Sequence, residues 1–126
     1  MAGHRRERAN GLIYEELALL LKDEVLDPRV QLVTVTGVDL TVDRRTARVY
    51  VACYTGEEDL ASGLQGLRSA SSFLRSRLAQ LLDWPFAPTL EFRVDRSWER
   101  GAKVDALLQA LEQESDEETG VDEEAG

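Results

Sequence analysis

The chain has 126 residues, 43% of them hydrophobic, which is enough for one domain with a core of its own. Its single cysteine, Cys53, excludes an internal disulfide, so nothing in the sequence requires an oxidising compartment. The formal net charge of −9 argues at first sight against a polyanionic partner. No apolar run approaches the length of about 20 residues that crosses a membrane, and residues 1–8 do not resemble a signal peptide. We therefore expect a cytoplasmic protein with no membrane partner.

The negative charge is concentrated at the C-terminus. Residues 112–126 contain eight of the 24 acidic residues and no Lys or Arg, which leaves residues 1–111 with a net charge of −1. The segment has almost no apolar residues, so the sequence predicts a domain over 1–111 and a disordered acidic tail over 112–126. Such a tail either only solvates the protein or competes with nucleic acid for the protein's own basic surface.

The first half of the chain reads as a helix followed by a hairpin. Apolar residues at three- and four-residue steps predict an amphipathic helix from about Arg6 to Leu26, which the sequence Asp27-Pro28-Arg29 ends. β-branched residues predict a strand from Leu32 to Leu40, and alternation predicts a second strand from Ala47 to Tyr54. The polar residues 43–45 between them are typical of a turn.

A long helix follows, with an unusual middle. An apolar stripe predicts helix to about Leu82, with Leu60, Leu64, Leu67, Leu74, Leu78 and Leu81 on one face. Small residues at 69–72 interrupt this stripe, and Phe73 falls about 120° away from it on a helix that turns about 100° per residue. Small hydroxyl residues are where helices bend, so we expect a kink there that brings Phe73 toward the core.

The last third is predicted as a loop, a strand and a helix. Residues 84–88 form the loop, residues 89–94 alternate as a strand with Leu90, Phe92 and Val94 on one face, and Ser97 is placed to cap a final helix. That helix contains the apolar residues Val104, Leu107, Leu108 and Leu111. The predicted fold class is α+β, in the order α-β-β-α-kink-α-β-α, with a three-stranded sheet and the helices on one of its faces.

An ordered set of short segments over about Arg5 to Leu111 carries a resemblance. The segments are Asp27-Pro28-Arg29, Val33-Thr34-Val35-Thr36-Gly37-Val38, Ala47-Arg48-Val49-Tyr50-Val51, Ser69-Ala70-Ser71-Ser72-Phe73-Leu74-Arg75, Pro88-Thr89-Leu90-Glu91-Phe92, Asp95-Arg96-Ser97 and Glu99-Arg100-Gly101-Ala102-Lys103-Val104-Asp105. In these the sequence resembles the ribosome-binding factor A family of bacterial small-subunit assembly factors. The resemblance implies a type II KH-like fold in which an Ala-x-Gly kink replaces the usual GxxG loop.

The resemblance also implies a function and its partners. It implies association with the immature small ribosomal subunit through rRNA, and assistance in late maturation and rRNA processing. Its expected partners are the small-subunit precursor and its rRNA, with ribosomal proteins as further candidates, and the protein is expected to be a monomer. The Ala-x-Gly kink maps onto Ala70-Ser71-Ser72, where Ser72 departs from the family pattern. If the kink needs a positive φ, serine is strained there, because only glycine enters that region freely.

The candidate RNA-binding residues are arginines, one lysine and the small residues of the kink: Arg5, Arg6, Arg8, Arg45, Arg68, Ser69, Ala70, Ser71, Ser72, Arg75, Arg100 and Lys103. Arginine suits bidentate phosphate contacts, but it is equally common on solvated helix surfaces and in turns, as at Arg44 and Arg45. The N-terminal arginines are candidates for a flexible arm that reaches rRNA. The aromatic residues Tyr50, Tyr54, Trp84 and Phe86 either stack on bases or pack in the core, and packing is the favoured reading.

The sequence gives no support for an enzyme. The only histidine is His4, close to the N-terminus, and no metal-ligand cluster, phosphate-binding glycine loop or nucleophile–base pair is present. No cofactor, metal or catalytic residue is therefore expected. A small-molecule domain of ferredoxin-like pattern lacks a convergent polar set. The stronger alternative is a protein-interaction module of KH-like fold without direct RNA contact.

Overall fold

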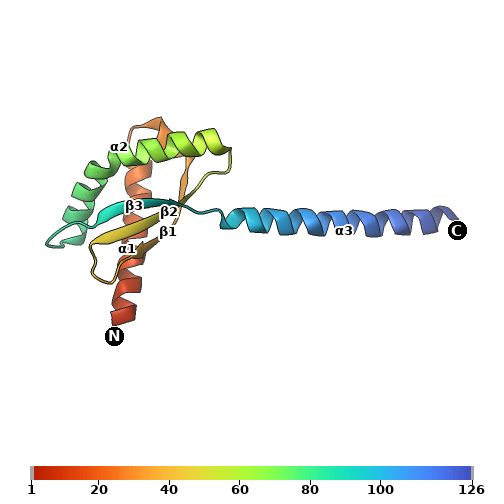
Figure 1. Cartoon of the computed structure of the whole chain (residues 1–126), viewed down its shortest axis with the longest axis horizontal. Helices are drawn as coiled ribbons and strands as arrows, with labels where there is room; N and C mark the ends of the chain where they lie inside the picture. The colour runs from red at the N-terminus through yellow and green to blue at the C-terminus, as the bar shows by residue number, and fades with distance from the viewer. Residues whose placement is uncertain (1, 126) are drawn as a thin grey trace. The chain divides into compact units, whose positions relative to one another are not determined.

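The computed structural model describes residues 2–125, and the side chains of residues 5–113. The chain divides into two compact units, Met1–Asp95 and Arg96–Gly126. Along the chain the elements are α1, a 3₁₀ helix η1, β1, β2, α2, β3 and α3 (Figure 1). The first unit holds every element up to β3, and the second consists of α3.

Helix α1 spans Ala2–Asp23, and its apolar stripe is buried as the sequence predicts. Ala9, Ile13, Leu17, Leu20 and Leu21 all lie in the core. The 3₁₀ helix η1 follows over Pro28–Leu32, where the Asp27 carboxylate accepts a hydrogen bond from the Arg29 backbone N–H at 3.0 Å. The predicted strand therefore does not begin at Leu32, because the Asp-Pro pair starts a short helix first.

The sheet has three strands in the order β1-β2-β3. Strands β1 (Thr34–Leu40) and β2 (Thr46–Ala52) form the predicted antiparallel hairpin, and β3 (Thr89–Val94) lies parallel to β2. The inward residues of β2 (Ala47, Val49 and Val51) are fully buried in one core with α1 and α2, so these two helices cover one face of the sheet. In β3 the inward face is less buried than predicted, because Val94 at its end is 37% exposed.

Helix α2 spans Glu57–Leu82 as one continuous helix, and Figure 1 shows its axis bending near the middle. Leu60, Leu67, Leu74 and Leu78 are buried as predicted, whereas Leu81 is exposed and Leu82 takes the core position instead. The expectation that the bend turns Phe73 toward the core is wrong. Phe73 is 43% exposed, and Ala70 and Leu74 fill the core side of the bend.

Ser72 needs no unusual backbone. The described residues with positive φ are Arg44, Gly56 and Asp83, so Ser72 has ordinary helical geometry within the bend. We predict that Ser72→Gly lowers the free energy of unfolding by about 0.5–1 kcal/mol, because glycine is the weaker helix residue at a site that does not need positive φ. Thermal or urea unfolding measures this difference, and a stabilised Ser72→Gly variant would show that the site prefers glycine.

Two glycines of α2 allow η1 and the residue that follows it, Val33, to pack closely, which the sequence alone does not predict. A Cβ at Gly63 would overlap Cγ1 of Val33 and lie 3.3 Å from its Cβ, and a Cβ at Gly66 would lie 2.9 Å from Cβ of Arg29. Both glycines are buried. The Gly63-Leu64-Gln65-Gly66 sequence is therefore a helix-packing site inside α2.

Helix α3 spans Ser97–Ala125, so its backbone continues through the predicted tail region. Its apolar residues Val104, Leu107, Leu108 and Leu111 are between 52% and 61% exposed. The sequence predicts the domain end at 111, whereas the compact unit ends at Asp95. Disorder of residues 112–126 in solution remains a prediction.

Candidate nucleic-acid interface

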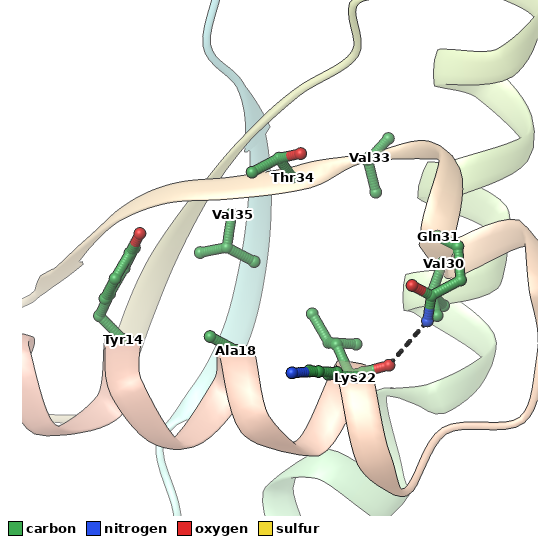
Figure 2. Close-up of a pocket in the computed structure, with 9 residues that line it drawn as sticks. Tyr14, Ala18, Lys22, Val30, Gln31, Val33, Thr34 and Val35 are labelled. Atoms are coloured by element: carbon green, nitrogen blue, oxygen red, sulfur yellow. Dashed lines mark hydrogen bonds between the residues drawn. The ribbon is translucent and has the colours of Figure 1, made fainter.

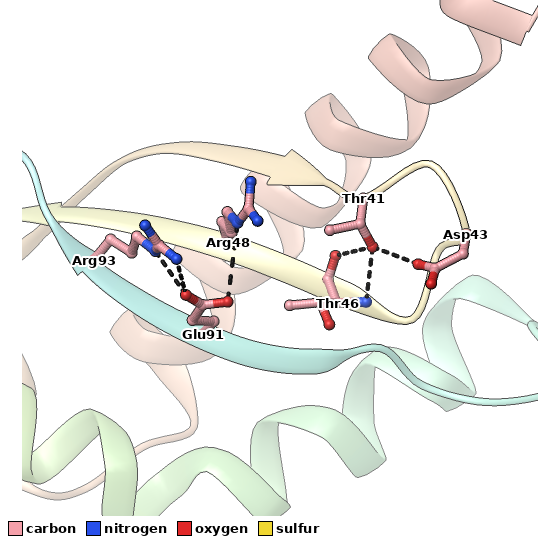
Figure 3. Close-up of polar contacts among 6 residues, drawn as sticks. All are labelled: Thr41, Asp43, Thr46, Arg48, Glu91 and Arg93. Carbon is pink, nitrogen blue, oxygen red and sulfur yellow. Dashed lines mark hydrogen bonds and ion pairs between the residues drawn. The ribbon is translucent and has the colours of Figure 1, made fainter.

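The basic residues fall into two groups according to their partners. Five arginines form ion pairs with carboxylates: Arg29 with Asp27, Arg48 and Arg93 with Glu91, Arg77 with Glu24, and Arg96 with Glu99. Figure 3 shows Arg48 and Arg93 converging on Glu91 on the open face of the sheet. Four carboxylates therefore offset most of the charge of these five side chains, since Glu91 pairs with two of them.

The second group has no ion pair within the described part of the chain. It contains Arg5, Arg6, Arg8, Lys22, Arg44, Arg45, Arg68, Arg75, Arg100 and Lys103. All eight basic residues that the sequence nominates for RNA binding belong to this second group. Their positive charge is therefore available to an external anion.

The β1–β2 turn presents Arg44 and Arg45 in a fixed geometry. The Asp43 carboxylate accepts a hydrogen bond from the Thr41 hydroxyl at 2.7 Å (Figure 3). It accepts a second one from the Arg45 backbone N–H at 3.0 Å. These two bonds hold the pKa of Asp43 below its ordinary value, the Thr41 bond having the larger effect. Arg44 adopts a left-handed backbone, and its guanidinium lies 5.7 Å from the Trp84 ring centroid.

Three parts of the first unit meet at the end of the sheet that carries this turn. Asn10 of α1 accepts a hydrogen bond from the Leu40 backbone N–H at 2.7 Å, which places the first turns of α1 beside the end of β1. Arg45 O accepts from the Thr89 N–H at 2.8 Å, and Arg75 of α2 donates to Pro88 O at 3.2 Å. Figure 1 shows the N-terminus, the β1–β2 turn and the α2–β3 loop on the same side of this unit.

We call this surface the basic end and define it as Arg5, Arg6, Arg8, Arg44, Arg45 and Arg75. It also carries carboxylates, among them Glu7 and Asp43, but the arginines outnumber these two acidic residues. The N-terminal arginines are not the flexible arm that the sequence suggests, because α1 begins at Ala2 and includes them. Their side chains are exposed on its first turns.

The helix α2 extends the basic end. Arg68, Ser72 and Arg75 are four and three residues apart, so they share one exposed face of the helix. Ser69 is exposed as well, whereas Ser71 is half-buried and Ala70 packs against the core. The kink therefore presents Ser69 and Ser72 to solvent and not the whole of residues 69–72. Arg100 and Lys103 are exposed on α3, in the second unit.

The four candidate aromatic residues have different environments. Trp84 is half-buried against the core, in agreement with the packing interpretation. Tyr54 and Phe86, in contrast, are 57% and 52% exposed, so core packing does not account for them. Tyr50 is half-buried on the open face of the sheet.

A hollow of about 200 Å³ lies between α1 and the start of β1, and it is not rich in basic residues. Figure 2 shows it lined largely by apolar side chains, among them Ala18, Val33 and Val35. Lys22 is the only basic residue in its lining. This hollow is therefore a poor match for a polyanion.

Other chemistry finds no support in the described residues. Among them no group of three or more His, Cys, Asp or Glu side chains is placed to hold a metal ion. No helix in the described part of the chain is long and apolar enough to cross a membrane.

The fold and this surface together define a small α+β domain with one sheet and an arginine-rich end. The chain belongs to the ribosome-binding factor A family, whose model matches residues 5–108. It is 40% identical over 118 residues to ribosome-binding factor A of Heliobacterium modesticaldum, covering 94% of this chain and 98% of the relative. It is 41% identical over 104 residues to that of Nitrosomonas europaea, covering 82% and 89%. The crystal structure of ribosome-binding factor A from Thermus thermophilus is similar with a TM-score of 0.64 and 29% identity, covering 73% of this chain and 97% of that one.

Proposed function

We propose that this protein binds the immature small ribosomal subunit through its rRNA and assists late maturation and rRNA processing. Membership of the ribosome-binding factor A family supports ribosome binding and a role in ribosome assembly. The arrangement of α1, α2 and a three-stranded sheet is the one that we assign to a KH-like domain of type II. On this proposal the protein works by binding, without catalysis and without a cofactor, and as a monomer in the cytoplasm.

One observation carries the proposal of RNA contact. Each basic residue nominated from the sequence forms no ion pair among the described residues, whereas five other arginines do. Unpaired arginines can give charge-assisted, bidentate contacts to phosphate. The proposed RNA-contacting residues are Arg5, Arg6, Arg8, Arg45, Arg68, Ser69, Ala70, Ser71, Ser72, Arg75, Arg100 and Lys103, and ribosomal proteins share the interface as further candidates.

A second candidate function is a protein-interaction module without direct RNA contact. The exposed apolar residues of α3 favour it, because Leu107 and Leu108 are 61% and 52% exposed there. Filter binding of protein-free small-subunit rRNA at two salt concentrations separates the two functions. Phosphate contact predicts that affinity falls steeply with salt, whereas weak binding that does not change with salt would favour the protein-interaction module.

The acidic tail gives an independent prediction. Removing residues 112–126 changes the formal net charge from −9 to −1 without removing any core residue. We expect rRNA affinity to hold or rise, since eight negative charges leave, and the melting temperature to stay nearly constant. Filter binding and thermal unfolding of both proteins measure this. A large loss of stability would show that the tail is folded against the rest of the protein.

A further inference from the structure

A second hollow lies at the basic end, between the β1–β2 turn and the α2–β3 loop. Its volume is about 250 Å³, and Asp43, Arg44, Trp84, Pro85 and Phe86 line it. Pockets for drug-sized ligands measure about 300–1,000 Å³, so this hollow suits one flat group of the size of a nucleobase better than a larger ligand.

The walls of this hollow are suited to a flat aromatic group. Phe86 leaves 52% of its surface exposed, although it lies beside the half-buried Trp84. The Arg44 guanidinium lies 5.7 Å from the Trp84 ring centroid, close enough for a cation–π interaction. The hollow therefore combines an exposed ring with a positively charged planar group, the two side-chain types on which nucleobases stack.

Asp43 adds a polar group of defined character. Its Oδ1 accepts from the Thr41 hydroxyl and from the Arg45 N–H, and Oδ2 accepts no hydrogen bond from another of the described residues. The two bonds to Oδ1 keep the pKa of Asp43 low, so at neutral pH the side chain is ionised and can only accept hydrogen bonds. A ligand in the hollow therefore meets a free acceptor.

We infer that this hollow binds one unpaired nucleobase of an RNA single strand, with guanine preferred. Phe86 and Arg44 stack on the base, and Asp43 accepts hydrogen bonds from its pairing edge. Guanine presents two adjacent donors on that edge, N1–H and the 2-amino group, whereas uracil presents only N3–H. Arg45, next in the chain, contacts an adjoining phosphate. This inference rests on the proposed function, since it names the RNA feature that the basic end recognises.

Four RNA pentamers that differ only in the central base, 5′-UUNUU-3′, test the inference. The full-length protein carries Trp98→Phe, so that its fluorescence reports Trp84 alone, the other tryptophan of the chain. We expect Trp84 fluorescence to change on binding, with UUGUU bound about tenfold more tightly than UUUUU, the difference that one additional hydrogen bond to a charged group allows. Equal affinity for all four RNAs, or no binding of any of them, would overturn the inference.

Two variants assign the effect to its residues. Asp43→Asn keeps an oxygen for Thr41 and Arg45 but replaces the free acceptor with an amino group, so we expect the preference for guanine to disappear. Phe86→Ala removes the stacking ring and should weaken binding of all four RNAs by about fivefold or more. Tyr54→Ala is the matched control, because Tyr54 is equally exposed but lies just beyond the opposite end of β2. Unchanged affinity and base preference in both pocket variants would overturn the inference.

Failure of the pocket is distinguishable from failure of RNA binding. Arg68 does not line the hollow, so the Arg68→Glu variant tests only the proposed contact of this arginine with phosphate. If that variant loses rRNA affinity while Asp43→Asn and Phe86→Ala behave as the unmodified protein, the nucleobase site is wrong and the RNA interface stands. If all three variants bind rRNA normally, both the inference and the RNA interface around Arg68 on α2 are wrong.

Discussion

Reversing the charge of Arg45 and Arg68 together is expected to weaken binding to small-subunit rRNA by at least tenfold. Both side chains are exposed and have no ion pair among the described residues, so their replacement by glutamate breaks no side-chain hydrogen bond or ion pair of the fold. A hydrogen bond to a charged group contributes about 1.5–3 kcal/mol, which is about tenfold or more in affinity for each lost contact. The slope of affinity against salt concentration should also fall by about 1 for each lost phosphate contact. Filter binding across a salt series measures both quantities.

Lys22→Glu provides the control for this double variant. Lys22 is also exposed and without an ion pair among the described residues, but it lies near the C-terminal end of α1, away from the basic end. Lys22→Glu changes the net charge by the same amount as each substitution in the double variant. A general electrostatic effect would therefore weaken rRNA binding by both the control and the double variant. If the double variant binds no more weakly than the control, the RNA interface does not lie on the turn and α2.

Gly63→Ala is expected to destabilise the first unit by about 1–3 kcal/mol, the usual cost of overpacking a core. Helix propensity alone predicts the opposite, because alanine is the better helix residue by about 1 kcal/mol. The added methyl group would overlap Cγ1 of Val33. It would also lie only 3.3 Å from the Val33 Cβ, so a rotation of the valine side chain alone does not relieve the close contact. Urea unfolding measures the change.

Gly11→Ala is the matched comparison for Gly63→Ala. Gly11 also lies within a helix, but a Cβ there has no neighbouring atom within 4 Å. This variant should therefore be stabilised by about 0.5–1 kcal/mol. If Gly63→Ala proves as stable as Gly11→Ala, the close approach of Val33, the residue after η1, to α2 does not limit stability.

The hydrophobic pattern predicts most of the fold, and the departures have physical causes. The apolar stripe of α1 and the alternating residues of β2 both lie on buried faces, so periodicity was sufficient to predict these residues as part of the core. Phe73 could not, because Ala70 and Leu74 occupy the core side of the bend whereas Phe73 is exposed. The role of the α2 glycines could not be predicted, because it depends on the position of η1 beside α2. The residues around these glycines in the sequence do not indicate that η1 lies there.

The candidate site was predictable in its residue types and not in its geometry. The clusters of arginine are visible in the sequence, but only the folded chain shows which arginines are paired, such as Arg77 with Glu24, 53 residues away. The grouping of the α1 arginines with the β1–β2 turn depends on Asn10 bonding to Leu40 across 30 residues. The small number of aromatic residues favours core packing for Phe86, whereas its position in the α2–β3 loop leaves it exposed.

Co-sedimentation of the full-length protein with small-subunit precursors, compared with mature small subunits, tests the central claim most directly. The proposed function predicts that the protein sediments with the precursors, that it does so less with mature subunits, and that the Arg45→Glu, Arg68→Glu double variant stays in the supernatant. Equal sedimentation of the unmodified protein with precursors and mature subunits would contradict a role in assembly. Normal sedimentation of the double variant would contradict the RNA interface.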